Sequence, residues 1–261
     1  MTRAASLADW YVQHGRHELP WRATRDRWPV LVSEVMLQQT QVSRVLDAWP
    51  GFIGRFPTAD SMASEPPGAV ITEWGRLGYP RRARRLWEAS AKIADEGWPA
   101  DLEELPGVGR YTARALLAQC DDRDVPAVEV NVRRVLQRAE GSVLTERACE
   151  TAMRRWGEPL TGRDRLLALM DLGATVCTAR DAECPRCPLT DRCATRGVLP
   201  GETRAKQAPY RGSFRERRGI VMRRLRSHRS GISTDDLDGM ALSSLVEDGL
   251  AVVSRGWARL P

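Results

Sequence analysis

The sequence predicts an all-α main body followed by a small C-terminal module of mixed structure. In residues 1–195, apolar residues recur at three- and four-residue spacing, which is the period of an amphipathic helix. Gly- and Pro-containing clusters separate these stretches, and no sustained period-two pattern precedes residue 200. The helical stretches are 30–45, 82–93, 111–120, 128–139 and 166–177, and the breaking clusters are 47–51, 66–68, 78–80 and 106–109.

The C-terminal part of the chain has a different pattern. A linker with several Pro and Gly residues is expected at 196–212, before a module at 213–261. Helical patterns then follow at 215–226, 233–238 and 241–248, and two short apolar segments flank Gly256 as in a β-hairpin. Three helices and a hairpin in this order are typical of a small winged-helix module.

Charge is unevenly distributed along the chain, whose formal net charge is +6. Residues 201–261 contain 12 basic and 7 acidic residues, whereas the first 200 residues are close to neutral. A basic end suits a polyanionic partner such as nucleic acid, although a solvated arginine-rich helix would have the same composition. Lys92 and Lys206 are the only lysines, so a mechanism that needs a lysine Schiff base has two candidates.

Composition also bears on location. No apolar run approaches the roughly 18 residues of a membrane span, and the first residues lack the apolar core of a signal peptide. We therefore expect a cytoplasmic protein without membrane contact. In such a reducing compartment, six cysteines favour a metal site or free thiols over disulfides.

Four of the six cysteines form a C-x6-C-x2-C-x5-C pattern. Four thiolates can complete a tetrahedral zinc site or a cubane iron–sulfur cluster. Zinc sites usually pair two short C-x2–4-C hooks, and this pattern has one, so the spacing favours the larger cluster. The remaining Cys120 and Cys149 fall in helical patterns and are expected to be buried. The four patterned cysteines are Cys177, Cys184, Cys187 and Cys193.

Two glycines stand directly before a predicted helix, in the segment Leu105-Pro106-Gly107-Val108-Gly109. They allow a tight turn and a close approach of the backbone to a partner. The amides at the start of the following helix could then bind a phosphate. A simple turn between two helices is the alternative.

Several segments occur together in a characteristic order. They are LPWR at 19–22, SEVMLQQT at 33–40, LGY at 77–79, the 105–109 hairpin, NVRRV at 131–135, LMDLGA at 169–174 and the cysteine loop. In order and spacing, the chain resembles the helix-hairpin-helix DNA glycosylases with a cluster loop, especially the MutY-type adenine glycosylases. The resemblance covers about residues 7–195, and its most specific parts are 33–40 and the cysteine spacing.

The resemblance implies a two-lobed helical fold. One lobe would be a six-helix barrel with the helix-hairpin-helix, at 26–130. The other would join residues 1–25 to 131–195 and hold a [4Fe–4S] cluster through the four cysteines. The partner would be double-stranded DNA with one nucleotide flipped out of the stack, bound by a monomer.

The resemblance also implies which residues are catalytic. Glu34 would be the general acid that protonates the leaving adenine, and its apolar neighbours favour the neutral carboxyl. Glu129 would stabilise positive charge on the sugar, with Asn131 beside it. The family normally has Asp at this position, so Glu129 is longer by one methylene, and a helix-start carboxylate is the alternative role. Tyr111 stands where the strand-cutting branch has lysine, which implies base release without cutting.

Further residues match substrate-contacting positions. The adenine pocket would include Trp21, Arg22, Leu37, Val42 and Asp171. Gln39 would fill the gap left by the flipped base, and Thr40, Leu77 and Tyr79 would surround the opposite base. Gly107, Val108 and Gly109 would hold a phosphate. Core packing is the alternative for Trp21, Leu37 and Val42, and a surface ion pair is the alternative for Arg22.

The predicted activity is hydrolysis of the N-glycosidic bond of adenine paired with 8-oxoguanine or guanine, in base excision repair. Removal of thymine or uracil opposite guanine is one alternative, and a DNA-binding relative with weakened catalysis is another. A zinc-bearing transcription factor would be colourless, unlike an iron–sulfur protein. Longer members of the family have a β-rich C-terminal domain that helps to read 8-oxoguanine. The module at 213–261 does not resemble that domain, so the sequence leaves the opposite-base preference open.

Overall fold

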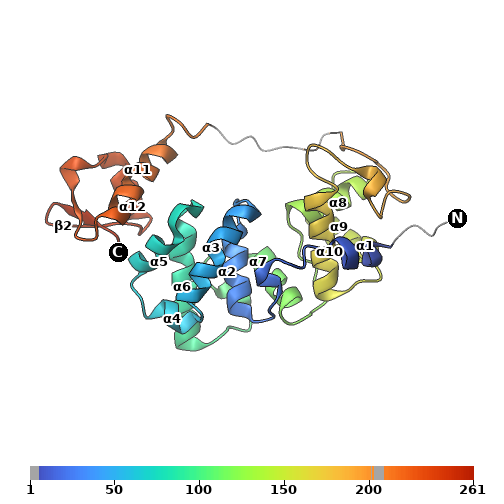
Figure 1. Ribbon diagram of the computed structural model, residues 1–261, viewed down its shortest axis with the longest axis horizontal. Coiled ribbons are helices and arrows are strands. Elements are labelled where there is room, and N and C mark those ends of the chain that lie inside the picture. Colours follow the sequence, from blue (N-terminus) through green and yellow to red (C-terminus); the bar gives the residue numbers. More distant parts are fainter. Residues whose placement is uncertain (1–5, 201, 203–208) are drawn as a thin grey trace. The chain divides into compact units, whose positions relative to one another are not determined.

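The structure, a computed structural model, describes residues 6–200, 202 and 209–261 (Figure 1). Part of the expected linker at 196–212 therefore lies outside the described residues. The chain divides into two compact units, each built from two separate stretches of sequence. The first unit contains residues 1–31 and 108–204, and the second contains 32–107 and 205–261. The divisions fall within α2 (Arg27–Leu37) and within the glycine hairpin.

The first unit is organised around α10 (Gly162–Thr175), which packs against α1, α7 and α8. Most of α10 is buried, since Leu166, Leu167, Leu169 and Leu172 all lie in the unit's hydrophobic core. The remaining elements are α1 (Leu7–His14), η1 (Pro20–Arg22), α7 (Arg110–Gln119), α8 (Val130–Glu140), α9 (Glu146–Trp156) and η4 (Cys184–Arg186).

The second unit is centred on α6 (Arg81–Glu96), which packs against α4 and α5. An aromatic cluster lies beside it: Phe52 contacts Phe56 and Trp74 at centroid distances of 5.1 and 5.8 Å, both edge-on. Such edge-to-face pairs stabilise a core beyond the area that they bury. The other elements of residues 32–107 are α3 (Val42–Arg55), α4 (Ala59–Ala63), α5 (Pro67–Trp74), η2 (Gly75–Leu77) and η3 (Leu102–Glu104).

The C-terminal module belongs to this second unit. Its helices α11 (Phe214–Ser227) and α12 (Gly239–Glu247) pack together. Strands β1 (Ile232–Ser233), β2 (Val252–Ser254) and β3 (Trp257–Arg259) form an antiparallel sheet in the order β1-β3-β2. Backbone bonds tie the module to residues 32–107, because the amide of Gly68 donates to the carbonyl of Pro261 at 2.7 Å.

The structure corrects three details of the predicted elements. The stretch 30–45 is two helices, α2 and α3, separated at residues 38–41. The cluster at 47–51, predicted to separate helices, does not interrupt α3. Pro50 lies inside this helix, whose buried face continues from Val45 through Trp49 to Phe52. The helix expected at 233–238 is only the single turn η5 (Thr234–Asp236), since Ser233 pairs with Trp257 in the sheet.

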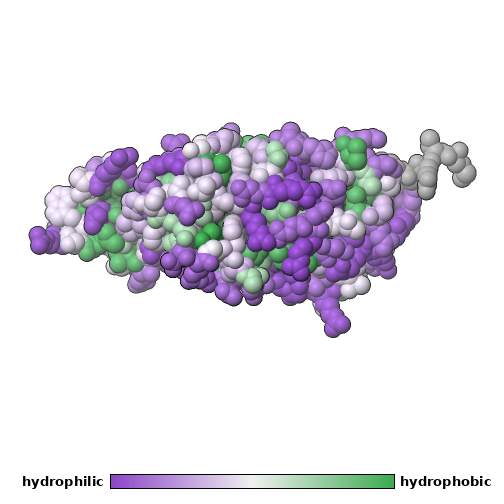
Figure 2. Space-filling model, turned by 90° about the horizontal axis from the view of Figure 1, so that it is seen from below, coloured by the Kyte–Doolittle hydropathy of each residue, from purple (hydrophilic) through white to green (hydrophobic). Residues whose placement is uncertain are grey.

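The exterior is mostly polar. On the face in Figure 2, hydrophilic residues cover most of the surface and hydrophobic residues form separate patches. No helix among the described residues is long and apolar enough to cross a membrane.

Candidate active site

Glu34 lies on the buried side of α2. Only 7% of its surface is exposed, and its helix neighbours Val35 and Met36 are buried as well. The residue is therefore largely shielded from bulk water, beside apolar neighbours on the same helix. Leu37, the last residue of α2, and Val42, the first of α3, are half-buried.

Two tight turns in the second unit carry the residues predicted to surround the gap and the opposite base. Gln39, between α2 and α3, has a φ of +56°, and Tyr79, before α6, has a φ of +49°. Non-glycine residues rarely adopt such positive values, so surrounding structure must hold both turns. Tyr79 is 40% exposed, whereas Leu77 is buried.

The buried side chain of Arg82 holds these two turns together. Its guanidinium lies within 5.1 Å of the Trp74 ring centroid and 5.5 Å of the Tyr79 ring centroid. Nη1 donates to the carbonyl oxygens of Val35, Met36 and Gln38 at 2.8, 2.9 and 2.6 Å. Nη2 donates to Thr40 Oγ1 at 3.0 Å and to the carbonyl oxygens of Leu77 and Gly78 at 3.3 and 3.0 Å.

Sequence reasoning missed Arg82, although a signal for it was present. On α6, Arg82 stands in line with the buried Leu86, Ala89 and Ile93, at the spacing of one helix face. A charged residue on an apolar face is an exception that calls for a specific partner. Here the partners are backbone carbonyl groups, which no side-chain pattern reveals.

The glycine hairpin forms as predicted, between η3 and α7. Gly107 has a φ of +82°, and a Cβ atom there would lie 2.9 Å from the Cβ of Arg85, so the position requires glycine. Gly109 is the N-cap of α7, which begins at Arg110. Val108 is buried and anchors the turn.

Glu129, in the first unit, is the N-cap of α8. Its Oε1 accepts a hydrogen bond from the amide of Val132 at 2.8 Å, and its Oε2 accepts one from Asn131 Nδ2 at 3.0 Å. Arg134 in turn donates to Asn131 Oδ1 at 2.6 Å. The helix-start role that the sequence left open for Glu129 is thus present, and it fixes the direction of the carboxylate.

The surroundings of Glu129 also affect its proton affinity. Burial is the largest influence and raises the pKa of Glu129 above its usual 4.5. Hydrogen bonds from the amides of Asn131 and Val132 and the charge of Arg134 lower the pKa, but they offset only part of the effect of burial.

Tyr111 lies in the first turn of α7 and packs against the first unit's core. Its hydroxyl contacts the sulfur of Met170 at 4.0 Å. The position provides no amine, as the sequence predicts. Lys92 lies in the other unit, paired with Glu104 at 3.3 Å and Glu96 at 3.9 Å, and Lys206 lies outside the described residues.

Asp171 is fully buried and paired with two arginines. Arg22 Nη1 and Nη2 donate to its two oxygens at 2.6 and 2.8 Å, and Arg16 Nε donates at 2.7 Å. Burial alone would raise the pKa of Asp171, but the hydrogen bonds and charges of Arg22 and Arg16 outweigh it and hold the pKa below its usual range. The ion pair of Arg22 is therefore internal rather than at the surface. Trp21, 3% exposed, is packed in the core.

Each unit thus gathers its own set of predicted site residues. The second unit holds Glu34, Leu37, Gln39, Thr40, Val42, Leu77, Tyr79 and Gly107. The first unit holds Trp21, Arg22, Val108, Gly109, Tyr111, Glu129, Asn131, Asp171 and the four patterned cysteines.

The four patterned cysteines are free thiols in the loop that follows α10. Arg138, which is 1% exposed, donates from Nη1 to Cys177 Sγ at 3.4 Å, and Cys193 Sγ donates to the Arg138 carbonyl at 3.4 Å. Burial raises the pKa of Cys187 to about 11, and the charges of the other three cysteines add to the effect. Across the described residues, no group of three or more His, Cys, Asp or Glu side chains is arranged to hold a metal ion.

The chain is similar to known proteins over most of its length. An adenine DNA glycosylase of Mycolicibacterium smegmatis is 40% identical over 266 residues, covering 94% of this chain and 90% of the relative. An adenine DNA glycosylase of Mycobacterium tuberculosis is 41% identical over 274 residues, and the alignment covers 94% of this chain and 88% of the relative. The chain belongs to the adenine DNA glycosylase family. This confirms the resemblance that the motifs at 33–40 and 177–193 indicated.

Other matches place this family member in a wider group. Residues 32–159 match the profile of the HhH-GPD superfamily base excision DNA repair proteins. The human adenine DNA glycosylase is 37% identical, and the alignment covers 80% of this chain but 42% of the human protein. The two bacterial relatives, by contrast, are matched over nearly their whole length, including most of the C-terminal module's span.

Solved structures confirm the helical glycosylase fold of this family member. A thermostable thymine-DNA glycosylase gives a TM-score of 0.67 at 24% identity, covering 73% of this chain and 93% of the other. A non-covalent endonuclease III–DNA complex gives a TM-score of 0.62 at 21% identity, covering 73% and 91%. At these identities, the likeness concerns the fold alone.

Proposed function

We propose that the chain hydrolyses the N-glycosidic bond of adenine mispaired with 8-oxoguanine or guanine in double-stranded DNA, and leaves the backbone uncut. The observation that carries this proposal is the 40–41% identity to adenine DNA glycosylases over almost the entire chain. The burial of Glu34 and the fixed carboxylate of Glu129 provide the two acidic groups that the reaction needs.

Glu34 acts first, as the proton donor to the purine ring of the flipped adenine. Protonation at N7 makes the base a better leaving group, and the C1′–N9 bond breaks. The carboxylate of Glu129 stabilises the positive charge that develops on the sugar. A water oxygen then bonds to C1′ and its proton restores the neutral carboxyl of Glu34, so the products are free adenine and an abasic site. Asn131 holds the Glu129 carboxylate in place.

Tyr111 accounts for the uncut backbone. Cutting by β-elimination needs an amine that forms a Schiff base with C1′, and a phenol cannot provide it. Leu37 and Val42, both half-buried, can touch the base directly. Trp21, 3% exposed, and Asp171, fully buried, lie in the interior of the first unit and would act without touching the base.

A [4Fe–4S] cluster is proposed on Cys177, Cys184, Cys187 and Cys193. Four free thiols in one 17-residue loop are the donor set that such a cluster requires. Burial raises the pKa of Cys177, and the guanidinium of Arg138 beside it offsets part of that effect. When bound, the cluster would tie together four points of a loop that has little regular structure.

The test is a panel of duplexes with A opposite 8-oxoguanine, A opposite G, T opposite G and U opposite G. Abasic sites are revealed by hot alkali. We expect cleavage of the two adenine-containing duplexes, and only after alkali. Cleavage without alkali would contradict the role of Tyr111. Release of thymine or uracil in place of adenine would establish the mismatch activity that the sequence left open.

Glu34→Gln tests the general acid in the same assay. It removes the proton donor with little change in shape, so we expect adenine release to slow by about 100- to 10,000-fold. Glu103→Gln makes the same chemical change at an exposed position on η3 and should release adenine at the wild-type rate. Unchanged activity of Glu34→Gln would mean that another group protonates the base.

A further inference from the structure

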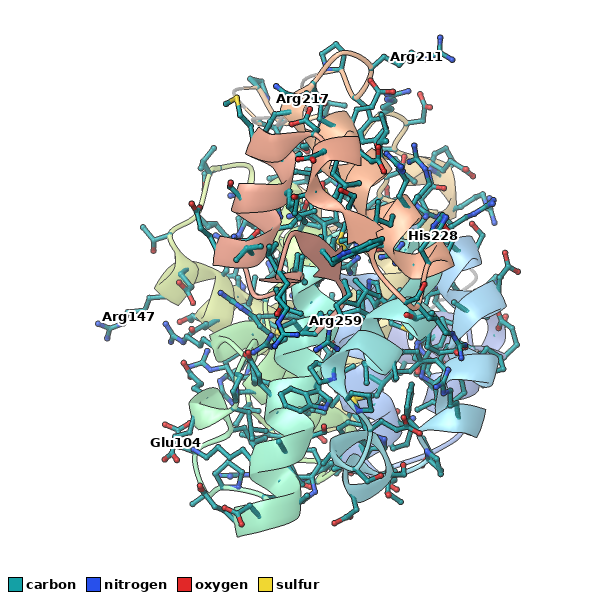
Figure 3. The ribbon with its side chains drawn as sticks, turned by 90° about the vertical axis from the view of Figure 1, so that its left-hand side faces the viewer. Glu104, Arg147, Arg211, Arg217, His228 and Arg259 are labelled. Atoms are coloured by element: carbon teal, nitrogen blue, oxygen red, sulfur yellow. The ribbon has the colours of Figure 1, made fainter. Side chains whose placement is uncertain are left out.

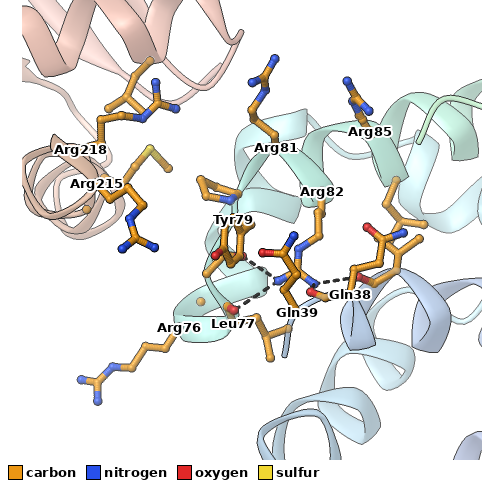
Figure 4. Close-up of a pocket in the computed structure, with 18 of the residues that line it drawn as sticks. Gln38, Gln39, Arg76, Leu77, Tyr79, Arg81, Arg82, Arg85, Arg215 and Arg218 are labelled. Atoms are coloured by element: carbon orange, nitrogen blue, oxygen red, sulfur yellow. Dashed lines mark hydrogen bonds between the residues drawn. The ribbon is translucent and has the colours of Figure 1, made fainter. Parts of the chain in front are cut away.

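A large groove in the second unit is lined by arginines. Its volume is about 1070 Å³, at the upper end of the roughly 300–1,000 Å³ typical of small-molecule sites. Nine of its described lining residues are arginines and none is acidic. Figure 4 shows Arg215 and Arg218 on the side of α11, and Tyr79, Arg81 and Arg85 on the side of α6.

One face of α11 forms a wall of this groove. Arg215, Gly219, Met222 and Arg226 line it at intervals of three or four residues, and Arg223 adds a further guanidinium. Arg217 lies on the same helix but not in the groove, and it pairs with Asp238 at 2.6 and 2.8 Å (Figure 3). The basic C-terminal charge seen in the sequence is therefore directed partly into the groove.

Several arginines of the groove have no acidic partner in the part of the chain that the structure describes. Arg218 pairs with Asp248, which Arg81 also approaches at 3.5 Å. Among the described residues, however, no acidic side chain pairs with Arg76, Arg85 or Arg223. Arg226 is engaged in part: its Nη1 donates to the Gly75 carbonyl at 2.6 Å, but its buried Nε has no partner in the described part of the chain.

The residues of the opposite wall of the groove indicate which DNA strand would lie there. It contains Gln39, Leu77 and Tyr79, the residues expected around the gap and the opposite base. A polyanion with planar groups fits an arginine-lined groove that also presents the exposed rings of Tyr79 and Tyr210. A flexible phosphodiester chain satisfies both requirements.

We propose that α11 binds the phosphodiester backbone of the DNA strand opposite the excised adenine, through Arg215 and Arg223. The inference rests on the proposed function, because that function supplies the duplex and its orientation. The C-terminal module is then a part of the DNA-binding surface and contributes one wall of the groove.

The test compares DNA binding by two full-length proteins. The parent carries Glu34→Gln, which prevents turnover, and the second protein carries Arg215→Gln/Arg223→Gln in addition. Fluorescence anisotropy with a duplex containing A opposite 8-oxoguanine is recorded over a series of salt concentrations. Loss of two phosphate contacts should weaken binding by on the order of tenfold per contact at 0.1 M salt and reduce the slope of log Kd against log salt by about 2. Arg215→Lys/Arg223→Lys, which keeps both charges, should restore most of the affinity and most of the salt dependence.

Arg259→Gln is the control for the loss of an arginine outside the groove, because it makes the same chemical change once at an exposed position of the same module. It should leave Kd and slope nearly unchanged. Thermal unfolding checks that every variant is folded. If the double variant binds like its parent while the wild-type chain releases adenine, the inference is wrong and the proposed function stands. If the slope falls but no adenine is released, the groove binds DNA and the proposed function is wrong.

Neutral methylphosphonate linkages assign the strand. Placed opposite the adenine, they should weaken binding by the parent chain and have little further effect on Arg215→Gln/Arg223→Gln. Placed in the adenine strand, they should weaken both proteins equally. The reverse pattern would overturn the assignment of α11 to the opposite strand.

Discussion

At Glu129, one carboxyl group caps a helix and, in the proposed mechanism, also stabilises the charge that the reaction creates. Asp, Asn, Ser and Thr are the usual N-cap residues, because their short side chains reach the free amides directly. Glu129 reaches the amide of Val132 with one more methylene, and Asn131 holds its second oxygen. The cap therefore compensates in part for the extra freedom of the longer side chain.

The raised pKa of Glu129 predicts a pH effect. In the proposed mechanism the carboxylate of Glu129 is the active form, so adenine release should decline as the pH falls through a value above the usual 4.5. Stability has the opposite dependence: an acid whose pKa is raised by folding favours the folded state while protonated, and this contribution is lost as the pH rises through the raised pKa. Single-turnover rates and unfolding free energies measured over the same pH range would show both effects.

Glu129→Gln is the comparison for both measurements. The amide cannot ionise, so the acidic decline should disappear from its residual activity. Its unfolding free energy relative to wild type should rise with pH over the same interval. Identical pH profiles for the two proteins would assign the titration to another group.

At the scale of elements, Arg82 joins the end of α2 to the turn before α6. Arg82→Lys keeps the charge but cannot reach six oxygen atoms in two turns, so several buried carbonyl groups lose their donors. We expect a loss of about 2–3 kcal/mol in the free energy of unfolding. Displacement of the turns by about 1 Å should also slow adenine release by on the order of 100-fold.

Arg81→Lys, at the exposed neighbouring position, is the control for Arg82 and should have little effect on either quantity. Thermal unfolding and single-turnover kinetics measure the two effects separately. If Arg82→Lys is as stable and as active as wild type, the guanidinium does not order the turns.

Local pattern predicted the helices well where neighbouring residues alone determine them. The stretch 82–93 lies within α6, and 111–120 nearly coincides with α7. The local pattern failed where contacts with residues distant in sequence determine the structure. Four polar residues separate Leu37 from Val42, but no Gly or Pro marks a turn there, and the turn is held by Arg82, more than 40 residues away. Ser233 leaves the helical state because Trp257 pairs with it.

The same contrast between local motifs and long-range contacts applies to the candidate site. Family motifs predicted individual residues such as Glu34 and Tyr111, because each lies in a short and specific sequence motif. The pairing of Asp171 with Arg16 and Arg22, about 150 residues away in sequence, could not be predicted from any local pattern. A sequence analysis that asks which charged residues occupy apolar helix faces would have identified Arg82.

At the scale of the whole molecule, the cysteine loop provides a direct chemical test. The purified protein should be coloured and contain iron, and Cys184→Ser should lose both colour and DNA binding. Cys120→Ser, outside the loop, should keep them. Absorbance, metal analysis and anisotropy measure the three properties. A colourless wild-type protein containing zinc would contradict the assignment of an iron–sulfur cluster.

Both units are discontinuous in sequence, and this has a consequence for the order in which they form during synthesis. The first unit has all its residues once position 204 has emerged from the ribosome, whereas the second also needs residues 205–261. Domains generally fold as units when their residues become available. The arginine-lined groove, one wall of which is α11, can therefore form only after the residues of the cysteine loop have been synthesised.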